Sequence, residues 1–265
     1  TPLVRLRIGL AGKTCCYLAC ITPLLFGFVI PVGVLLKFVL ASSLAVQIGG
    51  IASTVFNSVL ISAVAALLVM LISAVIVLAA TYRAGRHTRA MALVASTGYA
   101  FPGTMLAIGM LIFAGLIDRT VAAVTNDSVT GLLLGGFGVL VCAYLVRFQA
   151  VGYGATLSGV RRLPDNMMGA SRVLGHDFGS SLRQVILPLL RSSLVAGALL
   201  VFVDVMKELP MTLLLRPFDF ETLATFAYQF AKDEMLEEAA LPSLMIVIVG
   251  LVPVLLMNRM LRQSR

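Results

Sequence analysis

Long stretches without any charged side chain constrain this chain more than any other feature of its sequence. Five of them run for 19 to 45 residues, at 14–36, 38–82, 90–117, 128–146 and 239–258. A helix that crosses a bilayer needs about 20 mostly apolar residues, so each run can supply one span. The longest run contains the weaker segment ASSLAVQIGGIAST, so we expect it to form one span with an interfacial lead-in.

Composition agrees with an integral membrane protein. Of the 265 residues, 60% are hydrophobic and 12% are charged, and the mean hydropathy is +1.03. A soluble domain carries about 25% charged residues. The expected fold class is therefore an all-α integral membrane protein.

A sixth span is less obvious, because Asp204 interrupts an apolar run after 12 residues, at 192–203. We nevertheless expect a span there, and six spans place both termini on the same side. Pro102 in GYAFPGT should kink or locally break the third span. The expected spans are 15–41, 55–82, 91–117, 130–147, 192–213 and 241–258.

The distribution of charge predicts the orientation. Segments 1–14, 83–91, 147–191 and 259–265 carry 15 of the 20 Lys and Arg residues, but only two of the 12 acidic residues, Asp165 and Asp177. This is a strong positive-inside bias. Both termini and the long loop are therefore expected to be cytoplasmic, and the net charge of +8 reports topology rather than a nucleic-acid surface.

The expected organisation is a cytoplasmic flank at 1–14 and a six-span membrane domain at 15–262. This domain includes a cytoplasmic loop at 148–191 and an outer segment at 214–240. The outer segment contains most of the remaining acidic residues, which we expect to be mainly solvated. These acidic residues are Asp219, Glu221, Asp233, Glu234, Glu237 and Glu238.

Several kinds of site chemistry are not predicted. His87 and His176 are far apart, and the spacing of Cys15, Cys16, Cys20 and Cys142 is not that of a metal site, so the cysteines are expected to be small buried residues. The segment GLAGKT at 9–14 lacks the first glycine of a phosphate-binding loop and precedes a span. We therefore expect no catalytic residue, metal or cofactor in this chain.

The long loop reads as two short helices joined by a turn. Asp165 is a good N-cap for the first helix, along which Met167, Ala170 and Leu174 form an apolar stripe. Gly175 suits a left-handed helix end, and Asp177 can cap a second helix running to Pro188.

A hairpin of this size buries too little apolar area to be stable alone. Three arrangements are open from its pattern. It docks on another protein, it packs under its own bundle, or it rests on lipid headgroups through Arg161, Arg162 and Arg172.

At this point the residues resemble the permease subunits of binding-protein-dependent ABC importers. Their loop motif is E-A-A-x-x-x-G, followed by nine positions and I-x-L-P. Here Gly169, Ala170 and Ser171 occupy the E-A-A positions, with Arg172 and Leu174 before the matching Gly175. The isoleucine is displaced by one to Ile186, and Leu187 and Pro188 end the motif. The glutamate is missing.

The resemblance implies a type I ABC importer permease fold in the bacterial inner membrane. The loop would be a coupling helix that sits in a groove of an ATPase subunit, where ATP and magnesium would bind. The implied partners are an ATPase dimer, a second permease half or sister permease, and a periplasmic binding protein. GYAFPGTMLAIG, KELPMTLLLRP and DEMLEEAALPSLMIVIVGLVPV are similar to the ferric iron branch. The chain looks like the C-terminal half of a fused permease, which would explain why Thr1 comes first.

Ionisable groups inside a span mark a candidate site. Asp204, Lys207 and Glu208 have helical i, i+3 and i+4 spacing, so they are expected to share a face. They either neutralise one another near the outer surface or line the translocation path, where carboxylate oxygens would suit ferric iron.

Two rival functions stay open. The same machine could carry thiamine, a polyamine or a phosphonate. A secondary transporter or channel would need no docking hairpin, and would show polar or broken helices in two corresponding spans.

Overall fold

The computed structural model describes residues 9–41, 44–82, 85–125, 136–164 and 166–263, and all regular secondary structure within these ranges is helical. Six of the described helical segments are long and apolar enough to cross a membrane, as expected. The helices are α1 Leu10–Leu24, α2 Ile30–Ala41, α3 Leu44–Tyr82, α4 Arg86–Thr97, α5 Gly103–Thr125, α6 Phe137–Val160, α7 Met167–Val173, α8 Phe178–Ser181, α9 Leu187–Met206, α10 Pro210–Leu215, α11 Leu223–Lys232 and α12 Leu236–Gln263.

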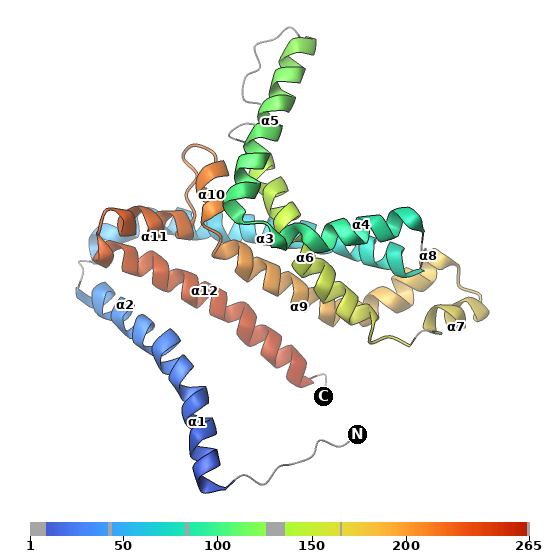
Figure 1. Cartoon of the computed structure of the whole chain (residues 1–265), viewed down its shortest axis with the longest axis horizontal. Coiled ribbons are helices and arrows are strands. Elements are labelled where there is room, and N and C mark those ends of the chain that lie inside the picture. Colours follow the sequence, from blue (N-terminus) through green and yellow to red (C-terminus); the bar gives the residue numbers. More distant parts are fainter. Residues whose placement is uncertain (1–8, 42–43, 83–84, 126–135, 165, 264–265) are drawn as a thin grey trace.

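The centre of the bundle is formed by α3, α6 and α9, which pack against one another (Figure 1). Tyr144 and Phe148 of α6 and Val201 of α9 are buried there. Close approach depends on a small residue on α6, because a Cβ atom at Gly152 would lie 2.6 Å from the Ser73 hydroxyl oxygen of α3. Small residues have this role between membrane helices, where shape complementarity replaces the hydrophobic effect as the driving force.

Two parts of the chain project from this bundle (Figure 1). The α1–α2 segment is continuous through a π-helical turn at Leu25–Val29, and only Val39 is buried along it. The far end of α5 extends away from the other helices. Their exposed apolar side chains suit contact with lipid or with another chain.

The expectation of buried cysteines is wrong. Cys15, Cys16, Cys20 and Cys142 are all exposed. The first three lie on α1, which has almost no packing partner among the described residues, and Cys142 lies on an exposed side of α6.

The third, fourth and fifth spans differ most from those expected. Pro102 disturbs the third helix, as expected, by breaking it, so amphipathic α4 is separated from the span α5 by a 3-10 turn at Gly98–Ala100. The fourth span, α6, runs to Val160, so Arg147 lies well inside it rather than at its end. The fifth crossing segment is Phe178–Met206, and not 192–213.

Candidate functional site

The loop hairpin, residues 166–186, has the turn that its sequence predicts. Gly175 has a φ of +91°, the left-handed region that favours glycine. The amide of Gly175 donates to the Arg172 carbonyl, and the amide of His176 donates to the Ser171 carbonyl. This is the Schellman pattern of a helix end. Asn166 occupies the N-cap position of α7, and the expected cap Asp165 lies outside the described residues.

Asp177 caps the second helix of the hairpin as predicted. Its carboxylate accepts from the amides of Ser180 at 3.0 Å and Gly179 at 3.3 Å. Hydrogen bonds from Ser180 hold the pKa of Asp177 below its usual range, so the cap is ionised at neutral pH.

The second helix was expected to end at Pro188, but it continues beyond this residue. A π-helical turn at Leu182–Ile186 joins α8 to α9, which continues through Pro188 to Met206. Pro188 has no amide hydrogen, and it comes directly after this π-helical turn, where the regular α-helical hydrogen bonding is already interrupted. The second helix of the hairpin is therefore continuous with a membrane span.

The two faces of α7 differ in what they contact. Met168 and Ser171 face the bundle and are buried, and the Ser171 hydroxyl donates to the Ser181 hydroxyl at 2.8 Å. The opposite face carries Val173, 88% exposed, and Leu174, 79% exposed.

The predicted stripe therefore splits, since Met167 turns partly toward the bundle whereas Ala170 and Leu174 do not. Ala170, Val173 and Leu174 form an apolar outward face that no described residue of this chain covers. Of the other motif positions, Gly169 and Arg172 are exposed, Ile186 is buried, Leu187 is half-buried and Pro188 is exposed.

A second candidate site lies where two helix breaks meet α6. The first break, between α4 and α5, contacts α6 so closely that a Cβ atom at Gly98 would lie 2.0 Å from the Val146 carbonyl oxygen. The second break separates α9 from α10 at residues 207–209. Arg147 of α6 reaches both breaks: its Nη1 donates to the Phe101 carbonyl at 3.4 Å, and its Nε lies 3.6 Å from Glu208 Oε2.

Glu208 is held on its other side by α10. Its Oε1 accepts from the Met211 amide at 3.2 Å, and its carbonyl accepts from the Thr212 hydroxyl at 2.6 Å. The Thr212 hydroxyl also hydrogen-bonds the Tyr144 hydroxyl of α6. A Cβ atom at Gly103 would lie 2.5 Å from Arg147 Nη1, so the start of α5 leaves room for the guanidinium.

The expected shared face of Asp204, Lys207 and Glu208 is wrong. The helix ends at Met206, so Glu208 turns away to Arg147. Asp204 pairs with Lys207 at 2.9 Å, beside Pro253 of α12. Among the described residues, no three His, Cys, Asp or Glu side chains converge as a metal site requires.

The 216–238 segment is tied to α3 by a polar network. Glu221 pairs with Arg216 and accepts from Gln229, and its carbonyl accepts from Asn57 of α3 at 3.2 Å. Asp219, Asp233, Glu234 and Glu237 are exposed, and Glu221 and Glu238 are half-buried. The exposed acidic residues of the 216–238 segment thus lie on a folded segment that is hydrogen-bonded to α3.

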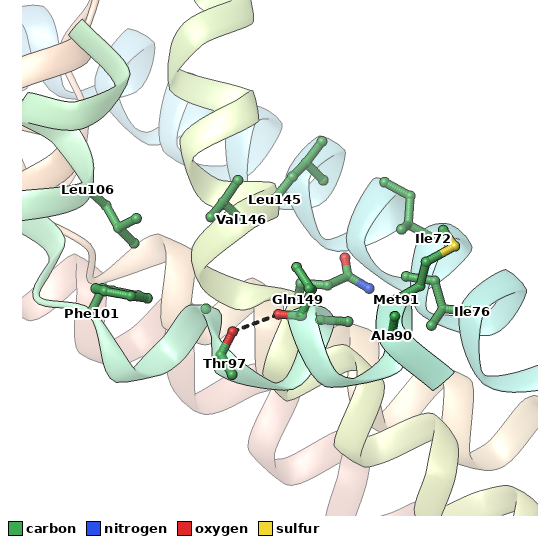
Figure 2. Close-up of a pocket in the computed structure, with 13 residues that line it drawn as sticks. Ile72, Ile76, Ala90, Met91, Thr97, Phe101, Leu106, Leu145, Val146 and Gln149 are labelled. Carbon is green, nitrogen blue, oxygen red and sulfur yellow. Dashed lines mark hydrogen bonds between the residues drawn. The ribbon is translucent and has the colours of Figure 1, made fainter. Parts of the chain in front are cut away.

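An apolar groove of about 600 Å³ separates α4 from α3 and α6 (Figure 2). Met91 of α4, Ile72 and Ile76 of α3 and Leu145 of α6 line it. The side chain of Gln149 also lines the groove, but its amide nitrogen donates a hydrogen bond to the Ser73 hydroxyl of α3 at 2.7 Å.

Sequence reasoning missed the Arg147–Glu208 pair. Arg147 stands at the very end of the expected fourth span, because it follows a charge-free run of 19 residues. The usable signal was the glycine-rich, helix-compatible sequence from 148 to 160, which extends the span beyond Arg147.

The fold and the loop hairpin define a multi-span membrane protein of the importer permease class, and comparisons with known proteins agree. The family model described as "Binding-protein-dependent transport system inner membrane component" matches residues 72–264, and the chain belongs to this family. It is 26% identical over 203 residues to the Fe(3+)-transport system permease protein FbpB 2 of Haemophilus influenzae, over 77% of this chain and 38% of that protein.

Solved structures show the same fold. A chain of a bacterial alginate ABC transporter, in complex with alginate pentasaccharide-bound periplasmic protein, aligns with a TM-score of 0.78 at 13% identity, over 95% of this chain and 94% of that one. A chain of the inward-facing MetNI methionine ABC transporter aligns with a TM-score of 0.61 at 16% identity, over 84% of this chain and 100% of that one. The resemblance found in the sequence is confirmed: this is an ABC importer permease component, a transport subunit.

Proposed function

We propose that this chain conducts ferric iron across the bacterial inner membrane, driven by ATP hydrolysis in a partner ATPase that binds ATP and magnesium. The observation that carries the ATP-driven part is the outward face of the loop hairpin. Ala170, Val173 and Leu174 present apolar side chains on a helix that Gly175 and Asp177 hold rigidly. A contact with an ATPase dimer would cover this face, as the resemblance implies for the coupling motif.

Ferric iron is supported by the name of the Haemophilus influenzae relative and by the sequence segments similar to that branch. The chain spans 38% of that relative, which fits the proposal that it works with a second permease half or a sister permease. The acidic 216–238 segment is the proposed contact for a periplasmic binding protein. Thiamine, a polyamine or a phosphonate is the alternative cargo.

The substrate proposal is tested by uptake in cells that express this chain with its partner subunits. We expect radiolabelled ferric iron to accumulate, and accumulation to stop when the chain is omitted. If thiamine, spermidine or a phosphonate accumulated instead, that solute would be the cargo and the ferric iron proposal would be wrong.

The same assay tests Asp204 as a path residue. Asp204→Asn removes a charge whose partner Lys207 is 60% exposed, so folding should change by no more than about 1 kcal/mol. We expect lower uptake at unchanged membrane abundance. Full uptake would remove Asp204 from the path, and reduced abundance would assign it a structural role.

The proposed orientation places both termini and the loop hairpin in the cytoplasm. It rests on the excess of basic residues in the segments on that side. A single cysteine at exposed Arg86, in a chain whose four native cysteines are replaced, should react with a membrane-impermeant maleimide only after the cells are opened. A cysteine at exposed Asp233 should react in intact cells, and the reverse pattern would invert the topology.

A further inference from the structure

Arg147 is a partly buried cation whose hydrogen-bonding capacity is largely unused. A guanidinium has five N–H donors. Within the described part of the chain, Arg147 makes one long hydrogen bond, to the Phe101 carbonyl, and its Nε has no hydrogen-bond partner. The contact of 3.6 Å with Glu208 is longer than the 2.7–2.9 Å of a charge-assisted hydrogen bond. Glu208 therefore balances the charge of Arg147 without saturating its donors.

Glu208 has a second attachment that explains the loose contact. Its Oε1 accepts the Met211 amide at the start of α10, so the carboxylate is shared between capping α10 and pairing with Arg147. It could keep the first role if another anion took over the second. Another anion could therefore replace Glu208 as the partner of Arg147.

The surroundings orient the guanidinium and leave it accessible. The rings of Tyr99 and Phe148 lie 5.8 Å and 5.9 Å from its central carbon, and this stacking fixes its plane. The side chain of Arg147 is 19% exposed, beside the exposed rings of Tyr99 and Phe101.

We propose that Arg147 is a binding site for an oxyanion group, a carboxylate or a phosphate, carried by the transported solute. The oxyanion takes the planar donors of Arg147 while Glu208 stays on α10. The planar guanidinium can donate two parallel hydrogen bonds to the two oxygens of such a group. Resting on the proposed iron function, the inference is that iron crosses as a ferric complex that keeps an oxyanion ligand.

Equilibrium binding to the purified transporter, this chain with its partner subunits in detergent, tests the inference. Radiolabelled inorganic phosphate and malonate are the probes, and they distinguish phosphate from carboxylate recognition. We expect saturable binding of at least one, weakened by about tenfold or more in Arg147→Gln, as for loss of a hydrogen bond to a charged group. Arg147→Lys keeps the charge but loses the planar pair of donors, and it should weaken binding less than Arg147→Gln does. Exposed Arg191→Gln is the matched control and should bind as the wild type does.

Glu208→Gln separates a binding site from a structural pair. The amide oxygen can still accept from Met211, but the competing charge is gone, so anion affinity should rise, by about tenfold if the lost competition equals one charged hydrogen bond. A purely structural pair predicts lower stability in both variants and no change in anion binding. The proposal is overturned if neither anion binds the wild type, or if binding is the same in Arg147→Gln. Ferric uptake is measured separately, so the iron proposal and the oxyanion site can fail independently.

Discussion

Replacing Leu174 with Asp should abolish uptake while the amount of this chain in the membrane stays normal. Leu174 is 79% exposed and belongs to the outward face of the loop hairpin, so folding does not need its side chain. If this face sits in a groove of the ATPase, the new carboxylate is buried without a partner there. Such a change at a contact centre costs about 2 kcal/mol or more, roughly a 30-fold loss of affinity.

The matched control is Asn166→Asp, which adds the same charge to the exposed N-cap position of α7. A carboxylate is favourable at an N-cap, so uptake should be unchanged. Gly175→Val should resemble Leu174→Asp, because a β-branched residue resists the left-handed conformation by about 1–2 kcal/mol and would turn α7 away. If the hairpin only rested on lipid headgroups, neutralising Arg161 and Arg162 would impair membrane insertion, and Leu174→Asp would have little effect.

Replacing Gly98 with Val should prevent the α4–α5 break from packing on α6. Even the first added atom would lie 2.0 Å from the Val146 carbonyl oxygen, which belongs to helix backbone and cannot turn aside. Overpacking of a tight contact costs about 1–3 kcal/mol and sometimes more. We expect a lower thermal midpoint in detergent, less chain in the membrane, and a smaller loss with Gly98→Ala.

Gly109 provides the control for this prediction. It lies on α5, where an added Cβ atom meets nothing within 4 Å. Gly109→Ala should leave the thermal midpoint unchanged or raise it, because alanine favours a helix by about 1 kcal/mol over glycine. Equal midpoints for Gly98→Val and the wild type would show that the break does not pack on α6 in this way.

Features set by neighbouring residues could be predicted from the sequence. The charge-free runs indicated five of the six spans, because bilayer thickness fixes their length. Gly175 and Asp177 were identified correctly, since a helix end and a cap depend on backbone groups within a few residues. Pro102 was expected to disturb its helix, and it does.

Features set by tertiary contacts could not be predicted. Helical spacing placed Glu208 beside Asp204, but the helix ends at Met206 and Glu208 finds Arg147 on another span. The burial of Arg147 depends on the two breaks meeting at α6, which no local pattern encodes. The stripe on α7 also split, because only packing decides that Met168 and Ser171 face the bundle.

Retention of an ATPase during purification of this chain tests the account most directly. The wild-type chain, extracted from native membranes in a mild detergent, should elute together with ATP hydrolysis activity. The Leu174→Asp chain should elute at the same yield with that activity lost, and the Asn166→Asp chain should retain it. Equal ATPase activity with Leu174→Asp and the wild type, or none with the wild type, would contradict the docking of the loop hairpin on an ATPase.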